Sequence, residues 1–280
     1  MTSFHIEKLC TGHIWTEGPI WLQKENAILF SDVKANCQYK YFLDIKKLTV
    51  YKAHSNYANG NAIDHRQCII SCSHGLRAIT RTKSNGEMVV LVDKLEGKRF
   101  NSPNDVVVKS DGTIWFTDPP YGIINDLEGF KAESQIIGCY VYSYNPKLNF
   151  LTIATSDTQR PNGLAFSPDE SKLYVADMSI VDFPTQGRCE LRVYDIVNNQ
   201  ALNGQTFCII SPGIPDGLCV DDSGNIYCSC EDGVIILNSS GQKIGKILIE
   251  ERVSNCTLGQ VDKSELYITA TTSLYRVKIK

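Results

Sequence analysis

The stretch Asn162-Gly163-Leu164-Ala165-Phe166, followed by the turn Ser167-Pro168-Asp169, is the clearest copy of a pattern that recurs along this chain. In each copy a polar residue and a small residue precede a short apolar run that ends in a turn. Three more clear copies begin at Glu17, Asn104 and Asp216, and two degenerate copies begin at Asn59 and Asn255. The copies are about 48 residues apart on average, which is the repeat length of β-propeller blades.

The rest of each repeat predicts further strands. In the copy that starts at Asn162, the runs Leu173-Tyr174-Val175, Leu191-Arg192-Val193-Tyr194 and Thr206-Phe207-Cys208 follow in turn. Short β-branched and aromatic runs that alternate with turns indicate antiparallel strands, and no run shows convincing helical periodicity. We therefore predict an all-β fold, a six-bladed β-propeller of four-stranded antiparallel blades that forms a single domain over residues 1–280.

The two ends of the chain predict how the ring closes. The last repeat has only three apolar runs, of which Ser273-Leu274-Tyr275-Arg276-Val277 is the third, while His5-Ile6-Glu7-Lys8-Leu9 precedes the first repeat. An N-terminal strand that completes the last blade would remove an open sheet edge, which is an aggregation hazard. A solenoid of the same repeats is the alternative, but the chain has no distinct capping repeat.

Composition narrows the classes of function. The net charge of −3 gives no basic surface for nucleic acid, and no apolar run approaches the ~18–20 residues that span a membrane. The N-terminal residues lack a secretory signal pattern. An odd number of cysteines, 11 in all, favours reduced thiols that pack as small apolar groups over a zinc or redox role. We expect a cytoplasmic protein, a monomer or weak homo-oligomer, with no nucleic-acid or membrane partner.

The first residues of the copies predict a binding site. The innermost strand of a propeller blade lines the central channel, so these residues should converge at one channel mouth. Glu17 and Asp216 bring carboxylates, and Asn104 and Asn162 bring amide oxygens. Oxygen ligands with two negative charges suit one divalent cation, Ca²⁺ first, with Mg²⁺, Mn²⁺ or Zn²⁺ as alternatives.

A purely structural interpretation of the same residues is also open. Asn-Gly and Asp-Gly are common turn dipeptides, and Asn or Asp before a strand often bonds the local backbone. We keep this interpretation for Asn59 and Asn255, whose copies are degenerate. Glu is a poor turn former, so Glu17 favours a functional site. A cation with about four protein oxygens keeps room for water or substrate, and it can polarise a carbonyl and activate water. Hydrolysis of an ester-like bond is the chemistry we expect, and no Gly-x-Ser-x-Gly elbow indicates a serine nucleophile.

The chain resembles the gluconolactonase branch of the SMP-30/gluconolactonase/luciferin-regenerating-like superfamily. The motifs that carry the resemblance span essentially the whole chain: Thr16-Glu17-Gly18-Pro19, Asn101-Ser102-Pro103-Asn104-Asp105, Trp115-Phe116-Thr117-Asp118-Pro119-Pro120-Tyr121-Gly122, Arg160-Pro161-Asn162-Gly163, Pro215-Asp216-Gly217-Leu218 and Ser273-Leu274-Tyr275-Arg276. The resemblance implies a six-bladed propeller with one catalytic divalent cation. It implies that Glu17, Asn162 and Asp216 are metal ligands, that Asn104 lies at the metal or the substrate, and that Asp216 is also the general base.

Other residues are candidates for substrate binding. Ser102 stands where the animal members of the family carry an arginine. His74 lies between two expected strands of the second blade, where it is either a proton carrier at the channel mouth or a hydrogen-bonded loop histidine. Asp118 and Tyr121 belong to the longest repeat, whose insertion over residues 119–137 is either a substrate wall or a solubilising loop.

These observations lead to one expected function and several alternatives. We expect a divalent-cation-dependent lactonase that opens a sugar lactone, such as glucono-1,5-lactone, to the hydroxy acid. The metal would polarise the carbonyl, and the metal or Asp216 would activate the water. A phosphotriester or aryl-ester hydrolase uses the same metal on another bond, and a binding propeller would hold a purely structural cation. Strictosidine-synthase-like condensation on a propeller is disfavoured, because residues of metal-ligand type recur in the repeats.

Overall fold

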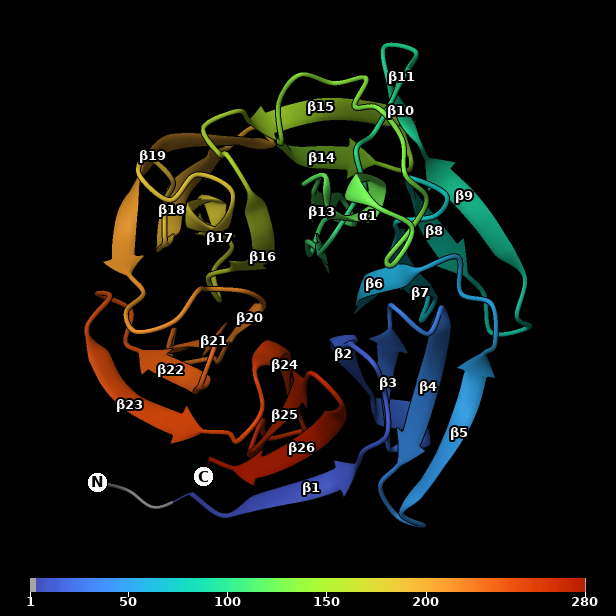
Figure 1. The fold of residues 1–280 in the computed structure, drawn as a ribbon, viewed down its shortest axis with the longest axis vertical. Coiled ribbons are helices and arrows are strands. Elements are labelled where there is room, and N and C mark those ends of the chain that lie inside the picture. Colours follow the sequence, from blue (N-terminus) through green and yellow to red (C-terminus); the bar gives the residue numbers. More distant parts are fainter. Residues whose placement is uncertain (1–3, 280) are drawn as a thin grey trace.

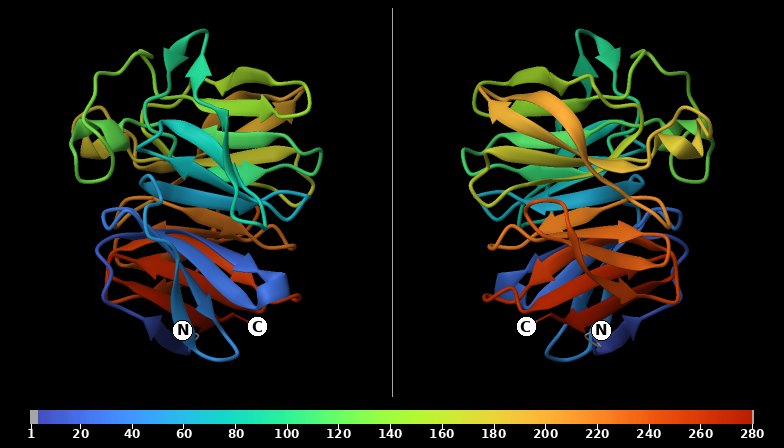
Figure 2. Two further views of the ribbon diagram at one scale, coloured as in Figure 1. Left: turned by 90° about the vertical axis from the view of Figure 1, so that its right-hand side faces the viewer. Right: turned by 90° about the vertical axis from the view of Figure 1, so that its left-hand side faces the viewer.

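Six four-stranded antiparallel sheets surround a central channel in the computed structural model, which describes residues 4–279 (Figure 1). The sheets follow one another around the ring in sequence order, so the predicted six-bladed propeller is confirmed. Residues 1–3 and 280 of the predicted domain lie outside the described residues. Side views show that the segments after the second strands of blades 3 and 4 project from the same face of the ring (Figure 2).

The first three blades each run from the channel outwards in chain order. Blade 1 contains β2 (Thr16–Leu22), β3 (Ala27–Asp32), β4 (Cys37–Phe42) and β5 (Lys47–Lys52), with the 3₁₀ turn η1 (Gln23–Glu25) after β2. Blade 2 contains β6 (Ala58–Ile63), β7 (Ile69–Ser73), β8 (Ala78–Thr82) and β9 (Met88–Val92). A short hairpin of β10 (Lys94–Leu95) and β11 (Lys98–Arg99) leads to blade 3. Blade 3 contains β12 (Val106–Val108), β13 (Ile114–Thr117), β14 (Val141–Asn145) and β15 (Phe150–Thr155), with the one-turn helix α1 (Tyr121–Ile124) after β13.

The other three blades complete the ring. Blade 4 contains β16 (Pro161–Phe166), β17 (Lys172–Asp177), β18 (Glu190–Val197) and β19 (Gln200–Ile209), with the 3₁₀ turn η2 (Ser179–Val181) after β17. Blade 5 contains β20 (Leu218–Val220), β21 (Ile226–Cys230), β22 (Gly233–Leu237) and β23 (Lys243–Leu248). Blade 6 contains β24 (Val253–Gly259), β25 (Glu265–Ala270), β26 (Ser273–Lys278) and, from the other end of the chain, β1 (Ile6–Cys10).

Pairing of β1 with β26 closes the ring. The two strands are antiparallel, with Ile6 opposite Val277 and Glu7 opposite Arg276, and the last pair also forms an ion pair. The prediction that an N-terminal strand completes the last blade is therefore confirmed. Opposite charges on facing strand positions add to the backbone pairing.

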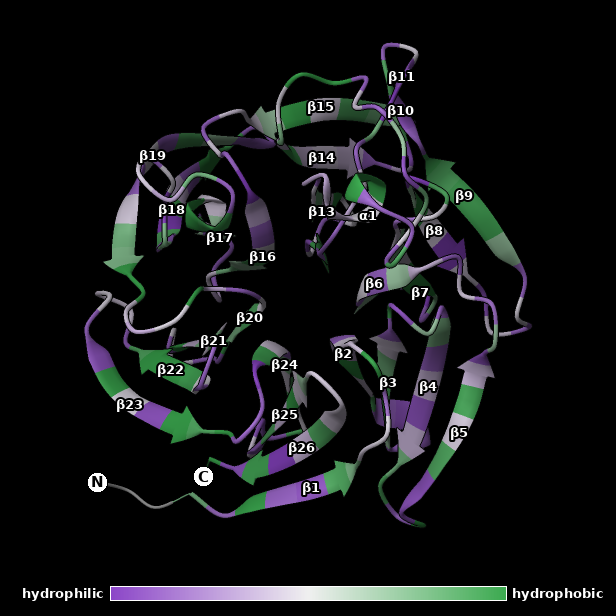
Figure 3. Cartoon of the chain, viewed as in Figure 1, coloured by the Kyte–Doolittle hydropathy of each residue, from purple (hydrophilic) through white to green (hydrophobic). Residues whose placement is uncertain are grey.

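The core lies between neighbouring sheets rather than in one central cluster. Trp115 and Val141 of blade 3 pack against Leu173 and Val175 of blade 4. Other clusters join blades 5 and 6 and blades 4 and 5 in the same way. Every residue of β3 and of β25 is buried, because second strands are covered on both faces by adjacent blades. The inner strands around the channel carry both hydrophilic and hydrophobic stretches (Figure 3).

The cysteines match the packing interpretation. All 11 are free thiols, and six of them are buried: Cys68, Cys72, Cys139, Cys228, Cys230 and Cys256. Burial is the usual state of a cysteine that serves as a small apolar side chain. Over residues 4–279, none of the helices has the length and apolar character that crossing a membrane would require.

Candidate functional site

A cavity of about 220 Å³ lies at one mouth of the channel. Its lining includes the four predicted ligands Glu17, Asn104, Asn162 and Asp216. It also includes Tyr121, a predicted substrate-binding residue, and Asn59, for which we kept the structural interpretation. The other lining residues are Trp15, Lys34, Glu128, Met178 and Arg252. The structure therefore brings together side chains that are up to 237 residues apart in the sequence, from Trp15 to Arg252.

Irregular strand pairing directs the first residues of the repeats into the channel. The register of β2 shifts between Glu17 and Ile20, and that of β16 shifts between Pro161 and Leu164. Bulges of this kind re-aim side chains and are common next to functional sites. In blades 3 and 5 the first strand begins only after Asn104 and Asp216, so these two residues are also free of the alternating pleat.

In blades 1, 2, 4 and 5 the second residue of the repeat is a glycine, which allows neighbouring blades to approach. Gly163 N donates to the Asp216 carbonyl at 3.2 Å, and Gly60 N donates to the Asn104 carbonyl at 2.8 Å. A Cβ atom on Gly163 would lie 2.4 Å from Asp216 O. The pair of a polar residue and a small residue thus has two functions, since the first points into the channel and the second joins the inner strands into a ring.

Glu17 is a buried carboxylate with few partners. Its side chain is 4% exposed, and Oε2 accepts hydrogen bonds from Gly18 N at 3.1 Å and from Asn255 Nδ2 at 3.3 Å. Burial raises the pKa of Glu17 well above its ordinary value, and repulsion by Asp216 and then Asp105 raises it further. A nearby positive charge would remove much of this penalty.

Asp216 is the second buried carboxylate of the cavity. Burial raises its pKa to about 7, against the opposing effect of Arg252, and Asp105 raises it further. Its Oδ1 atom is buried and has no hydrogen-bond partner in the described part of the chain. A carboxylate oxygen in that state requires a proton, a water or a cation.

The two predicted amide ligands are nearly buried as well. Asn104 is 4% exposed and Asn162 is 5% exposed. The Nδ2 atom of Asn162 lies 2.9 Å from Met178 Sδ, which leaves its Oδ1 as the free end of the amide. The Asn162 carbonyl accepts a hydrogen bond from Thr117 Oγ1 of blade 3 at 2.7 Å, so neighbouring blades fix the backbone of this residue.

This donor set fits a hard divalent cation. Two carboxylates and two amides supply oxygen only, and one buried carboxylate oxygen is unpaired. Between residues 4 and 279, no three His, Cys, Asp or Glu side chains are grouped so that they could hold a metal ion by themselves. A cation in this cavity would therefore depend on the asparagine oxygens as well as on Glu17 and Asp216.

Three of the predicted substrate-binding residues, Ser102, Asp118 and His74, do not line the cavity. Ser102 is fully buried, donates from Oγ to the Pro119 carbonyl at 2.6 Å and accepts from Gly122 N at 2.9 Å. Asp118 is fully buried, and its Oδ2 accepts from Asn101 N at 2.9 Å. Burial raises the pKa of Asp118 to about 7. In the structure Ser102 and Asp118 anchor the segments on either side of Asn104.

The position of Asp118 recurs in other blades. Asp32 at the end of β3 accepts from Ile14 N and Trp15 N, both at 3.0 Å. Asp177 at the end of β17 accepts from Gln159 N at 2.9 Å and Arg160 N at 3.2 Å. In each case an aspartate at the end of the second strand fixes the chain that enters the first strand.

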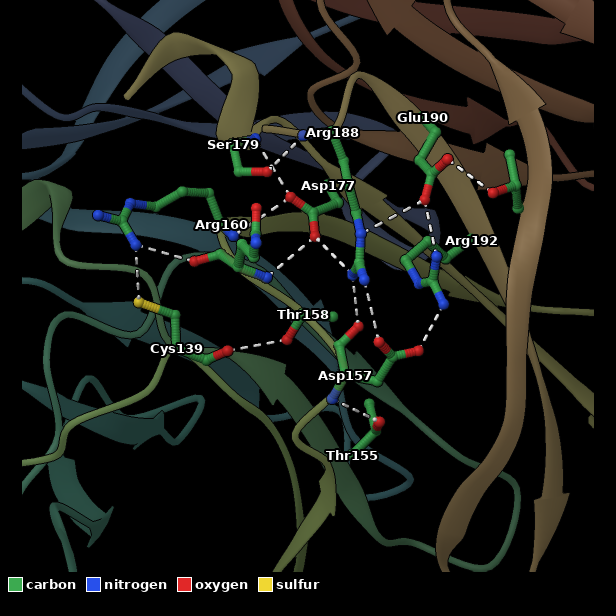
Figure 4. Close-up of polar contacts among 12 residues, drawn as sticks. Cys139, Thr155, Asp157, Thr158, Arg160, Asp177, Ser179, Arg188, Glu190 and Arg192 are labelled. Carbon is green, nitrogen blue, oxygen red and sulfur yellow. Dashed lines mark hydrogen bonds and ion pairs between the residues drawn. The ribbon is translucent and has the colours of Figure 1, made fainter. Parts of the chain in front are cut away.

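The network around Asp177 shows how firmly one entry segment is held (Figure 4). Asp177 is fully buried, and Arg188 Nη1 lies 3.5 Å from its Oδ2. Arg188 in turn contacts Asp157 at 3.2 Å, and Ser179 Oγ accepts from Arg188 N at 2.7 Å. This network holds both the segment before Asn162 and the segment after Met178, and these two residues contact each other in the cavity.

His74 lies behind the cavity wall. It is 1% exposed, and its Nε2 lies 3.2 Å from Asn59 Nδ2 while its Nδ1 lies 2.9 Å from the Glu128 carbonyl. Burial lowers its pKa. The histidine is therefore placed to orient a residue of the cavity rather than to touch a ligand directly.

Several lining residues were absent from the sequence-based candidates. Lys34 lies over the ring of Trp15 at 4.9 Å and pairs with Glu128 at 3.3 Å, and Arg252 lies 5.5 Å from the same ring. Lys34, Glu128 and Arg252 come from loops outside the repeated pattern. Of these three residues, only Glu128 could have been found from the sequence, because it falls in the long insertion over residues 119–137. Glu128 and Tyr121 make that insertion part of the cavity wall.

The chain also matches known proteins along its length. Residues 15–272 match the SMP-30/Gluconolactonase/LRE-like region. A gluconolactonase from Zymomonas mobilis is 31% identical over 98% of this chain and 81% of its own. The structure of a gluconolactonase from Xanthomonas campestris is 34% identical and superposes with a TM-score of 0.91 over 98% of this chain and 89% of its own. A calcium-binding regucalcin from Agrobacterium tumefaciens, 17% identical, shares the fold with a TM-score of 0.77 over 99% of this chain and 96% of its own. The chain belongs to the SMP-30/gluconolactonase/LRE-like family.

Proposed function

We propose that this protein is a lactone hydrolase that opens a polar sugar lactone, with glucono-1,5-lactone as the first candidate, and that it depends on one divalent cation, Ca²⁺ first. The observation that carries the proposal is the convergence of Glu17, Asp216, Asn104 and Asn162 on one small cavity. The full-length similarity to proteins described as gluconolactonases supports the substrate class. The 11 free cysteines support a reducing compartment, and we propose the cytoplasm.

Different residues of the cavity would bind the cation and the substrate. Glu17, Asp216, Asn104 and Asn162 would hold the cation, which when bound supplies a Lewis acid for the lactone carbonyl. Tyr121 lines the cavity wall, where an aromatic ring can pack against the apolar face of a sugar ring. The small volume, about 220 Å³, favours a monosaccharide-sized lactone over a larger substrate.

Asp216 would act first as the general base and then as the general acid. A carboxylate has two oxygens, so one can bind the cation while the other accepts a proton from the attacking water. The hydroxide equivalent adds to the carbonyl carbon, the bond from that carbon to the ring oxygen breaks, and the proton passes from Asp216 to the departing ring oxygen. The product is the open-chain hydroxy acid, whose carboxyl proton is released to the solvent.

Acid release from glucono-1,5-lactone tests the proposal. The rate is measured with the untreated protein, with protein stripped by EDTA, and with stripped protein after addition of Ca²⁺, Mg²⁺, Mn²⁺ or Zn²⁺, each corrected for spontaneous hydrolysis. We expect loss on stripping and recovery with a cation. Full activity in the stripped protein, or in both Glu17→Gln and Asp216→Asn, would rule out the proposed mechanism.

A further inference from the structure

Asn59 presents an unpaired oxygen to the cavity. The side chain is 4% exposed and lines the cavity, and its Oδ1 atom is buried with no hydrogen-bond partner among the described residues. Its backbone is fixed, because the Asn59 carbonyl accepts from Ser31 Oγ at 2.7 Å and from Asn61 Nδ2 at 2.9 Å. A buried acceptor without a partner is costly in a folded protein and requires an explanation.

His74 determines which end of the amide faces the cavity. The Glu128 carbonyl can only accept a hydrogen bond, so the Nδ1 atom of His74, 2.9 Å away, carries the proton. The Nε2 atom of the neutral ring is then an acceptor, and the Asn59 atom that lies 3.2 Å from it must be the donating Nδ2. The orientation of Asn59 therefore follows from the hydrogen-bond network, and its oxygen points away from the histidine.

The imidazole itself has little freedom to turn. A Cβ atom on Gly122 of α1 would lie 2.5 Å from His74 Cβ and Cγ, so the helical turn packs directly on the ring. Glu128, whose carbonyl receives the Nδ1 proton, also pairs with Lys34 at 3.3 Å and lines the cavity. The insertion over residues 119–137 thus holds His74 from two sides.

Asn61 provides the contrast within the same strand. Its Nδ2 donates to the Gly18 carbonyl at 2.8 Å and to Ser31 Oγ at 3.0 Å, and its Oδ1 accepts from Gln38 Nε2 at 2.8 Å and Ser71 Oγ at 2.6 Å. A structural asparagine in β6 therefore has partners at both ends of its amide. Asn59, two residues earlier, has partners only at the end that faces away from the cavity.

We propose that Asn59 is a specificity residue, whose Oδ1 accepts a hydrogen bond from a ring hydroxyl of the lactone, and that His74 and the Glu128 carbonyl position it for that contact. The inference rests on the proposed function. Blade 2, which carries Asn59, lies across the ring from blade 5, which carries Asp216 (Figure 1). Asn59 and Asp216 therefore enter the cavity from opposite blades, and the inference assigns the cation to the side of Asp216 and a substrate hydroxyl to the side of Asn59.

The substrate class that follows is a hydroxylated lactone. A site with a buried acceptor discriminates against an analogue that lacks the matching hydroxyl, because the acceptor then stays unpaired when water is displaced. The unsubstituted six-membered ring of δ-valerolactone is such an analogue. Glucono-1,5-lactone has the same ring and carries the hydroxyls.

The experiment compares these two lactones in wild-type protein, Asn59→Ala, His74→Phe, His74→Gln and the control His65→Phe. His65 is exposed and contacts the Lys109 carbonyl at 3.2 Å, away from the cavity. For each protein kcat/KM is measured on both lactones, Ca²⁺ affinity is measured by calorimetry on stripped protein, and a thermal melt reports folding.

We expect Asn59→Ala to lower kcat/KM for glucono-1,5-lactone about tenfold, the worth of one hydrogen bond of this kind, with δ-valerolactone turnover and Ca²⁺ affinity changed less than about twofold. His74→Phe should give a smaller loss with the same selectivity, and His74→Gln should recover part of it, because a glutamine oxygen can accept from Asn59 Nδ2. His65→Phe should match the wild type.

Two results would overturn the inference while leaving the proposed function intact. Equal losses on both lactones in Asn59→Ala and His74→Phe would mean that the residues act on stability or on the reaction in general. A tenfold fall in Ca²⁺ affinity in Asn59→Ala would make Asn59 a cation ligand instead. Failure of the proposed function would show differently, as wild-type protein that opens neither lactone, and it would remove the inference with it.

Discussion

The Nδ2 atom of Asn255 lies 3.3 Å from Oε2 of Glu17, so that the last blade of the ring donates a hydrogen bond to the carboxylate of the first. The same Nδ2 atom lies 3.4 Å from Asp105 Oδ2 of blade 3. Asn255 and Asp105 face a separate cavity of about 400 Å³ on the other side of this contact. Asn255 therefore stands between two buried carboxylates and orients the one that faces the candidate site.

Replacing Asn255 should weaken cation binding without removing a ligand. In Asn255→Ala, Glu17 loses its side-chain donor, and its repulsion with Asp105 is no longer moderated by an amide between them. Loss of such an outer partner typically lowers metal affinity ten- to a hundredfold. Calorimetric titration of the stripped protein with Ca²⁺ measures the effect. An unchanged dissociation constant would show that Glu17 is oriented by Gly18 N and its own strand alone.

In the cation-free protein, the buried carboxylate of Asp216 should destabilise the fold, although the proposed reaction requires it. The folded pKa of about 7 lies above the ordinary value of 3.8, so the unfolded chain gives up this proton at a lower pH than the folded one. The stability of cation-free protein should therefore fall as the pH rises from about 4 to 7.

Asp216→Asn removes that penalty, so the cation-free variant should melt above the wild type at pH 7. The two should converge near pH 4. Each kcal/mol of added stability raises Tm by roughly 2–4 °C in a domain of about 150–250 residues. Added Ca²⁺ should stabilise the wild type more than the variant, and the variant should lack lactonase activity. A lower Tm for the variant at pH 7 would mean that Asp216 is paired in a way that offsets its burial.

The contacts of Glu251 should make the stability of blade 6, which closes the ring, depend on pH. Burial works against ionisation, but hydrogen bonds from Ser273 Oγ at 2.6 Å and Tyr275 Oη at 2.7 Å lower its pKa to about 2. Lys8 of β1 lies 3.4 Å from the same carboxylate. Because the folded pKa is below the unfolded one, the stabilisation is complete above about pH 4.5 and is lost as the pH falls toward 2.

Glu251→Gln should accordingly lower Tm at pH 7, and its difference from the wild type should shrink to nothing near pH 2. Thermal melts between pH 2 and 7 measure this. Glu250→Gln is the matched control, because Glu250 is the adjacent, exposed carboxylate. A difference between Glu251→Gln and wild type that does not vary with pH would assign the effect to packing rather than to charge.

The blades and the four proposed ligands could be predicted because their signals are local and repeated. Turn residues and β-branched runs mark the strands, and the polar residue before each first strand marks the channel. The recurrence of Asp32, Asp118 and Asp177 after a second strand was also in the sequence, as Phe30-Ser31-Asp32, Phe116-Thr117-Asp118 and Val175-Ala176-Asp177. Comparison of the repeats at that position would have indicated a structural role for Asp118.

The difference between the two degenerate copies could not be predicted in the same way. Asn59 faces the candidate cavity, whereas Asn255 faces the opposite one, and this depends on where each inner strand leaves its regular register. The register of β6 shifts between Ala58 and Asn61, and that of β24 shifts between Val253 and Asn255. A slip of one residue turns a side chain to the other face, and no residue type marks it. Arg252 and Lys34 were missed because loop positions have no repeat.

Deletion of residues 1–10 should destabilise the whole ring rather than one edge. The deletion removes β1, leaves the outer edge of β26 unpaired and removes Glu7 and Lys8, which pair with Arg276 and Glu251. An unpaired edge strand also recruits other chains. We expect a lower Tm and concentration-dependent aggregation, measured by calorimetry and light scattering. Removing only residues 1–3 is the control, because Phe4 already packs against the core cluster of blades 5 and 6. Because blade 6 packs on blades 5 and 1, the loss should reach the candidate site, and Ca²⁺ affinity should fall in the longer deletion only. A longer deletion that melts like the wild type would show that three strands suffice for blade 6.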